Sequence, residues 1–430
     1  MKDSMPVRQT RTVFYGYVVV LAAFLIMAAS SGSVFSFSVF FASLQAEFGW
    51  TRAVTSAAFS LHMVVQGLLA IGVGRLNDRF GPRVIVTICG LTMGLGFALV
   101  SRIDAVWQLY LLYGVLIGAG VSGGPIPLMS TVARWFRARR GMMTGIVMAG
   151  VGVGTMVVPP FADWLIRTLS WRSSYVAVGL LLMVVVPIAA QFLKRDPSQM
   201  GLRPMGSDEI VDGVQTPPST QGLSFSDAVH TRQLWLLAMA FAGFGFTAHS
   251  VMVHVVVHAT GLGLSPTSAA GLMTAIGALG VVGRVGLGSL ADRHGAKRLM
   301  VAQFALLSLS LLWFAAARDT WSIYGCALSF GFAFGGIVPL NSHMMAELFG
   351  LRAHGAVLGA TGLSIGMGSA IGPVFTGYCY DVLGSYSVPF LTCSGVAAAA
   401  GLLIILVRPL STEPPLAVPP GSPRGAASPR

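Results

Sequence analysis

Charged residues are scarce in this sequence. Only 10% of its 430 residues are Asp, Glu, Lys or Arg, against about 25% in soluble domains. Hydrophobic residues make up 54% of the chain, and the mean hydropathy is +0.76. A water-soluble protein of this length would have too little charge to cover its surface. The composition therefore excludes soluble enzymes and nucleic-acid-binding proteins, although the formal net charge is +12.

Cysteine is also rare, and the cysteines that occur show no paired spacing. Cys89, Cys326, Cys379 and Cys393 lie in apolar runs. This pattern is typical of small buried residues and not of a disulfide framework or a metal site. The sequence also has no nucleoside-triphosphate P-loop, zinc motif or nucleophile elbow. We therefore expect a protein that is not an enzyme and that binds neither a metal nor a cofactor.

Long apolar runs are abundant. A hydrocarbon core of about 30 Å is crossed by about 20 mostly apolar helical residues, and no stretch alternates like a membrane β-strand. The sequence predicts an all-α membrane protein with twelve transmembrane helices. The expected spans are Tyr15–Leu44, Ala53–Leu76, Val84–Ser101, Val106–Thr131, Met142–Ile166, Tyr175–Phe192, Leu234–Ala259, Thr267–Leu290, Leu299–Ala317, Trp321–Met345, Ala356–Tyr380 and Ser387–Val407.

The basic residues predict the orientation in the bilayer. If the N-terminus is inside, 21 of the 27 Lys and Arg residues lie in cytoplasmic segments, 5 lie in the opposite loops, and Arg284 lies within a span. Basic residues concentrate on the cytoplasmic side of membrane proteins. We therefore expect both termini to be cytoplasmic, and the positive charge needs no nucleic-acid partner.

The spans fall into two sets of six. We expect an N-terminal bundle (residues 1–193), a cytoplasmic linker (194–232) that is polar and contains proline, and a C-terminal bundle (233–410). The tail, residues 411–430, contains six prolines and no apolar period, which predicts disorder.

The two sets of spans match at a constant offset of 214 residues. Gly49 matches Gly263, and Pro159 matches Pro373. One offset that holds across several spans without a gap indicates two copies of a six-helix unit, which run parallel because six is even. The densest matches fall in the turns after spans 2 and 8, which contain Gly74, Asp78, Arg79, Gly81 and Arg83, and Gly288, Asp292, Arg293 and Gly295.

These two turns resemble the loop signature of the major facilitator superfamily. Their glycines allow a tight turn between two helices, and their basic residues fit the cytoplasmic side. The resemblance implies the major facilitator fold. It also implies that the turns help to hold the state that is closed toward the cytoplasm.

A narrower resemblance concerns two segments. Trp135–Gly150 is similar to the signature of the monocarboxylate transporters, with an aromatic pair, basic residues and then small residues along span 5. The start of span 1, Phe14–Val19, is similar to the other signature of that family. Bacterial relatives of the oxalate–formate exchanger type share much of this pattern. The resemblance implies a transporter of small organic anions, which we place in the bacterial inner membrane.

Arg284 is a charged residue deep in the membrane. It lies eight residues before Asp292, or about 12 Å of helix, which is near the bilayer midplane. An arginine there costs at least about 2.5–3.5 kcal/mol, and no Asp or Glu lies within a turn of it along span 8. A substrate carboxylate would compensate the charge, since the guanidinium group binds it bidentately. Backbone carbonyls or packing at the domain interface are the alternatives.

The resemblance implies a role for Arg284, and the sequence beside this residue departs from the family pattern. In the monocarboxylate transporters, an arginine at the corresponding place in span 8 binds the substrate carboxylate. Family members often carry an Asp nearby, but Gly280 and Gly261 occupy the aligned positions here. A proton-coupled Arg–Asp pair is therefore not expected.

Histidines on span 7 are substitutes for the missing acid, because imidazole titrates near neutral pH. His254 and His258 share a helix face near the outer end, and they are candidates for proton coupling. His249 lies deeper and is a candidate for substrate binding. Histidines bonded to carbonyls or packed at the interface are the alternative.

Three further polar residues complete the candidate substrate site. They are Tyr113 and Ser122 on span 4 and Asn341 on span 10. Such residues also serve as contacts between membrane helices, which is the alternative reading.

We therefore expect a monomeric secondary transporter of a small organic anion. A monocarboxylate such as lactate or pyruvate would bind between two rocking halves, with proton symport as a companion hypothesis. An oxalate–formate-type or dicarboxylate exchanger is the alternative. The single intramembrane arginine favours one carboxylate.

Overall fold

The computed structural model describes residues 14–136, 139–206, 222–350 and 352–408, without the side chains of residues 71, 140, 288, 289 and 292. This part of the chain is helical apart from its connecting turns and loops, and it contains two isolated β-bridges. It contains twelve helices long and apolar enough to cross a membrane, which confirms the predicted fold class. The tail predicted to be disordered, residues 411–430, lies outside the described residues.

The helices of the first half form six spans. They are α1 (Tyr15–Phe35) with α2 (Phe37–Phe48), α3 (Arg52–Phe80), α4 (Pro82–Val100), the series α5 (Val106–Leu109), η1 (Tyr110–Ile117), α6 (Gly118–Val121) and α7 (Pro125–Trp135), then α8 (Arg140–Thr168) and α9 (Trp171–Gln191).

The second half has one helix for each span. They are α11 (Arg232–Gly261), α12 (Pro266–His294), α13 (Ala296–Ala316), α14 (Thr320–Phe349), α15 (His354–Leu383) and α16 (Ser387–Leu406). Between the halves lie a short 3-10 helix, η2 (Pro197–Met200), and α10 (Phe225–Val229).

The first span is one candidate membrane helix, Tyr15–Phe48, with a local irregularity at Ser36 between α1 and α2. The Ser36 hydroxyl donates to the carbonyl of Ser33 at 2.6 Å, and that of Ser38 donates to the carbonyl of Phe35 at 3.0 Å. Serine hydroxyls that bond nearby carbonyls compete with the regular helix pattern. The second piece, α2, then continues to Phe48 and ends at Gly49.

The backbone reproduces the repeat seen in the sequence. Gly49 and Gly263 have φ of +67° and +94°, and Gly81 and Gly295 have φ of +85° and +80°. Each pair is separated by 214 residues. Only glycine adopts this left-handed region without strain, so the same residue is required at the same turn in both copies.

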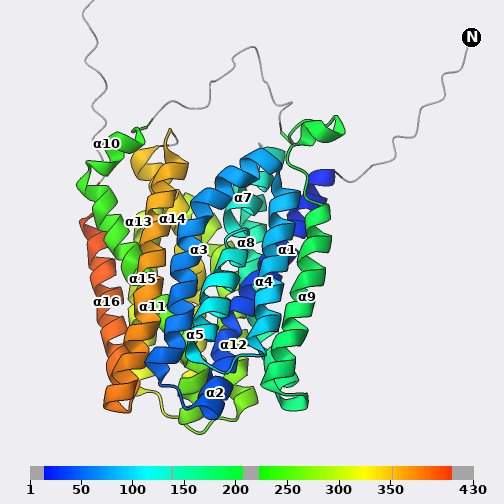
Figure 1. The fold of residues 1–430 in the computed structure, drawn as a ribbon. Helices are drawn as coiled ribbons and strands as arrows, with labels where there is room; N and C mark the ends of the chain where they lie inside the picture. Colours follow the sequence, from blue (N-terminus) through cyan, green and yellow to red (C-terminus); the bar gives the residue numbers. More distant parts are fainter. Residues whose placement is uncertain (1–13, 137–138, 207–221, 351, 409–430) are drawn as a thin grey trace, which may run out of the picture.

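The two ends of the bundle are distinct (Figure 1). One end carries the α3–α4 turn, the α12–α13 turn and α10, and the other carries α2 and α5. We call them the basic end and the far end. At the basic end, the N–H of Met205 donates to the carbonyl of Trp135 and the N–H of Leu223 donates to that of Phe349, each at 3.0 Å. Trp135 and Phe349 are repeat equivalents, so the linker attaches to both halves in the same way.

The two halves touch mainly through the helix pairs α8–α12 and α3–α15, and also through α2 and α11. The α8–α12 contact is made by bare backbone, since a Cβ on Gly277 would lie 2.5 Å from the carbonyl oxygen of Gly152. The Thr274 hydroxyl also donates to the carbonyl of Met156 at 3.0 Å. These contacts lie in the middle of the bundle.

At the far end, α15 packs on the start of α3. A Cβ on Gly377 would lie 2.7 Å from the carbonyl carbon of Arg52. Toward the basic end, α3, α8, α12 and α15 carry glycines around which there is free space: a Cβ would meet nothing within 4 Å at Gly72, Gly145, Gly286 and Gly359. The halves therefore pack together from the middle to the far end and are looser at the basic end.

Candidate functional site

Arg284 lies where the two halves meet. It projects from α12, and its guanidinium carbon is 5.4 Å from the centre of the Phe334 ring on α14. A Cβ on Gly152 of α8 would come within 3.1 Å of Nη1, so the absence of a side chain there makes room for the guanidinium. The site thus combines a charge from the second half with a bare backbone surface from the first.

The guanidinium is buried without a matching charge. The Arg284 side chain is 6% exposed, and within the described residues Nε and Nη1 have no hydrogen-bond partner. It is also the only buried Lys or Arg in this part of the chain. A cation–π contact with Phe334 contributes about 0.5–2 kcal/mol, less than the effective penalty of several kcal/mol for burying an ion. Backbone carbonyls, which were an alternative to a substrate carboxylate, therefore do not bond Nε or Nη1 in the described structure.

His249 lies beside the same group of aromatic rings. Its ring centre is 6.2 Å from that of Phe35 and 6.0 Å from that of Phe59. Phe35 packs edge-on against Phe334 at 6.4 Å, and Phe334 contacts the guanidinium. A continuous series of rings from both halves thus connects Arg284 with His249.

The hydrogen bonds of His249 all involve Nδ1. This nitrogen lies 2.8 Å from the Ser369 hydroxyl on α15 and 3.2 Å from the carbonyl oxygen of Gly245. The side chain is half-buried. The ring is therefore held by α11 and α15 on one edge only.

His62 is a further polar residue of this region and was not among the residues predicted from the sequence. It lies on α3, is fully buried, and has no hydrogen-bond partner on either ring nitrogen within the described part of the chain. Its ring centre is 5.9 Å from that of Phe59 and 5.6 Å from that of Tyr113. The test that singled out Arg284, a polar residue far inside an apolar span, would have found it.

The remaining substrate-site candidates make contacts within their own half. The Tyr113 hydroxyl donates to the carbonyl of Val34 at 3.0 Å, and that of Ser122 donates to the carbonyl of Ala119 at 2.6 Å. The Asn341 amide donates to the Thr361 hydroxyl at 3.1 Å, whereas its Oδ1 is buried without a partner in the described structure. Their role as substrate contacts stays a prediction.

His254 and His258 lie toward the far end and share a helix face, since both rings pack on Tyr386. Both nitrogens of His254 are engaged: Nδ1 lies 3.0 Å from the Tyr386 hydroxyl and Nε2 lies 2.9 Å from the carbonyl oxygen of Pro373. Nε2 of His258 has no partner among the described residues. The ring packs edge-on against Phe390 at 5.1 Å.

The signature turn of the first half is fixed by polar contacts. Asp78 forms an ion pair with Arg134 of α7 at 2.9 Å, and Arg83 donates to the side-chain oxygen of Gln191. The Arg79 guanidinium lies 5.2 Å from the Phe80 ring centre. A Cβ on Gly74 would have only Ile126 nearby, at 3.7 Å. The turn is therefore tied to spans 4 and 6 of its own half.

The matching turn of the second half is bound by an acidic residue of a neighbouring helix. The N–H of Ala296, which follows Gly295, donates to Glu347 of α14 at 3.3 Å. Arg293 is exposed. Gly288 and Asp292 lie within α12. The surroundings of these two positions lie outside the described part of the structure.

The two segments that resemble monocarboxylate transporters contact each other at the basic end. Phe14 packs on Trp135 at 5.8 Å and on Phe136 at 5.7 Å, and Tyr15 packs on Trp135 at 5.5 Å. The indole N–H of Trp135 donates to the carbonyl of Lys194 at 2.8 Å. The sequence segments that carry the resemblance therefore form one aromatic cluster that joins spans 1 and 4 to the linker.

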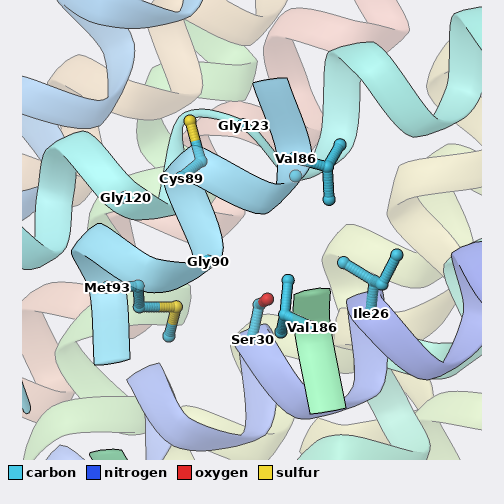
Figure 2. A pocket seen from close by; sticks show the side chains of 10 residues that line it. Ile26, Ser30, Val86, Cys89, Gly90, Met93, Gly120, Gly123 and Val186 are labelled. Atoms are coloured by element: carbon cyan, nitrogen blue, oxygen red, sulfur yellow. The ribbon is translucent and has the colours of Figure 1, made fainter. Parts of the chain in front are cut away.

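A small cavity lies elsewhere in the first half, between α1, α4 and α6 (Figure 2). It measures about 10 Å³ and is lined by Ser30, Cys89, Gly120 and other residues. This volume suits a single water molecule, so it is too small for an organic anion. Over the described ranges, no group of three His, Cys, Asp or Glu residues could hold a metal ion.

The fold and the buried arginine between its halves are those of a membrane carrier. The family model described as "Major Facilitator Superfamily" matches residues 19–339 and 236–428. The chain therefore belongs to the major facilitator superfamily.

Individual relatives extend over nearly the whole chain. Monocarboxylate transporter 13 of Rattus norvegicus is 29% identical over 396 residues, which cover 91% of this chain and 89% of the relative. Monocarboxylate transporter 11 of Homo sapiens is 27% identical and covers 92% and 83%. The uncharacterized MFS-type transporter YhjX of Escherichia coli is 26% identical and covers 79% and 82%. The chain is a multi-pass membrane transporter of the monocarboxylate-transporter type, not an enzyme.

Proposed function

We propose that this protein carries a small monocarboxylate, such as lactate or pyruvate, by alternating access across a bacterial inner membrane, as a monomer with proton symport. The observation that carries this proposal is the buried Arg284 guanidinium, which lacks a partner and lies between the halves. An ion pair with a carboxylate at about 4 Å gains about 4 kcal/mol at an effective dielectric constant of 20, before desolvation. The substrate supplies the missing negative charge.

The packing of the halves supports alternating access. They meet through bare glycine backbone in the middle and are looser at the basic end. With the termini and the basic end in the cytoplasm, this arrangement corresponds to an inward-facing conformation. Rocking about the middle would then expose Arg284 to the other side.

An exchanger of oxalate, formate or dicarboxylates is the alternative within transport. A dicarboxylate calls for a second cation, and Arg284 is the only buried Lys or Arg in the described chain. This favours one carboxylate. Lactate accumulation driven by a pH gradient distinguishes symport from exchange.

The test is uptake of radiolabelled L-lactate, pyruvate and oxalate into proteoliposomes. Arg284→Ala and Arg284→Met should abolish saturable uptake, whereas Arg102→Ala, an exposed arginine, should leave it unchanged. Because Arg284→Met replaces an unpaired buried charge by an apolar chain, its melting temperature should equal or exceed that of the parent. Saturable lactate uptake by a folded Arg284→Met protein would overturn the proposal.

A further inference from the structure

A proton-coupled carrier needs a group inside the membrane that takes up and releases a proton. Asp163 is the only buried Asp or Glu in the described part of the chain, and it pairs with Arg167 at 3.0 Å near the far end of α8. The spans therefore offer no acid near Arg284 for this purpose. The histidines of α3 and α11 remain as groups of the spans that titrate near neutral pH.

The hydrogen bonds of His249 determine which of its nitrogens carries the proton. The Ser369 hydroxyl donates its proton to the carbonyl of Ile365 at 2.7 Å, so it accepts from His249. The carbonyl oxygen of Gly245 also accepts. Both bonds require a hydrogen on Nδ1, so in the neutral ring Nε2 is left with its lone pair.

The other histidines are less suited. His254 has both nitrogens engaged, with Nε2 donating to the carbonyl of Pro373 and Nδ1 accepting from Tyr386. Protonation would disturb these bonds. His62 has no fixed tautomer and is fully buried, whereas His249 is half-buried. Among the histidines of α3 and α11, His249 is the one that combines a free acceptor nitrogen with partial exposure.

Few charged or titratable groups surround His249. Of the titratable groups on the neighbouring helices, His62 on α3 lies close enough to interact electrostatically with His249. Arg284 on α12 is connected to His249 through the rings of Phe334 and Phe35. At this level α15 contributes Ser369, and α1 and α14 contribute the rings of Phe35 and Phe334. A proton on His249 would thus add a second positive charge to the region lined by the rings that also contact Arg284, which favours an anion there.

We propose that His249 is the proton-binding group of the transport cycle and that Ser369 is a positioning residue that fixes its tautomer. This inference rests on the proposed carriage of a monocarboxylate. Nε2 takes one proton from water on the side where the carrier is open, and the imidazolium releases the same proton to water on the other side. The carboxylate and the proton cross together, so no net charge moves.

The test uses proteoliposomes with radiolabelled L-lactate. With one proton coupled to each lactate, an inward gradient of 1 pH unit supports about tenfold accumulation. The parent and His254→Gln should show this accumulation, while His249→Gln should give a ratio of about 1. Lactate counterflow without a gradient, measured in parallel, tests the proposed function itself. Counterflow without accumulation in the parent would overturn this inference and the proton symport in the proposed function, but not the carriage of a monocarboxylate.

Ser369→Ala provides a second readout. Without the hydroxyl, the imidazolium loses a charge-assisted hydrogen bond, so the pH midpoint of lactate uptake should move to lower pH. If His249→Gln also loses counterflow, the pH profile of Ser369→Ala tests the proposal instead. A shifted midpoint of lactate uptake supports the proposal, and an unchanged midpoint overturns it. Full accumulation by His249→Gln, or its loss only in His62→Gln, would also overturn it.

Discussion

The carboxylate of Asp381, at the far end of α15, accepts a hydrogen bond of 2.9 Å from the backbone N–H of Arg52, the first residue of α3. Its second oxygen accepts from the N–H of Ala53 at 2.8 Å. An acid from one half thus caps a helix of the other half, where unpaired N–H groups and the helix dipole favour negative charge. The Arg52 guanidinium lies 3.4 Å from the centre of the Tyr380 ring. These contacts close the far end.

Asp381→Ala should weaken this closure. Loss of a helix cap costs about 0.5–2 kcal/mol, so the population open at the far end should rise several-fold. Spin labels at Leu169 and Trp321, both exposed near the far end of their halves, would report this as a larger share of long distances. Asp104→Ala is the control, since Asp104 pairs only within its own half, with Arg172. An unchanged distance distribution in Asp381→Ala would contradict the assignment.

Gly152→Ala should block transport. The new Cβ would lie 2.6 Å from Val281 and 3.1 Å from Nη1 of Arg284, so α8 and α12 would have to separate at the site. Overpacking of this kind costs about 1–3 kcal/mol, and lactate uptake should fall at least tenfold. At Gly145 of the same helix a Cβ meets nothing within 4 Å, so Gly145→Ala should transport normally. Equal uptake by the two variants would refute the close contact.

Trp135→Ala should destabilise the first half. Trp135 is fully buried in the aromatic cluster and bonds the linker through Lys194. Its removal should cost about 3–5 kcal/mol and lower the melting temperature of the detergent-solubilised protein. Trp107, which is 61% exposed, provides the control, and Trp107→Ala should melt within a few degrees of the parent. If both variants melt alike, the cluster is not a stabilising element.

The sequence predicted the spans and the repeat because both depend on local properties. The length of apolar runs determines the number of spans, and turns that need glycine at φ near +80° recur at a fixed spacing, as at Gly81 and Gly295. Arg284 could be singled out because a charge in an apolar run is unusual, and this is seen without knowing which residues surround it in the fold.

Contacts between distant residues could not be predicted in this way. Asp381 and Arg52 are 329 residues apart in the chain, and nothing in either segment identifies the other. The tautomer of His249 depends on Ser369, which is 120 residues away. The local irregularity at Ser36 was also not predicted, because an apolar run does not indicate which hydroxyls bond the backbone.

The glycine-to-backbone contact between α8 and α12 has a consequence for the energy of the conformational change. Surfaces that meet through main-chain atoms pack closely but interlock few side chains, so the two helices can tilt about the contact with few rotamer changes. The contact can therefore act as a pivot. The energy barrier between the two conformations would then be set by the few polar contacts at the far end, such as those of Asp381, and single substitutions can change it.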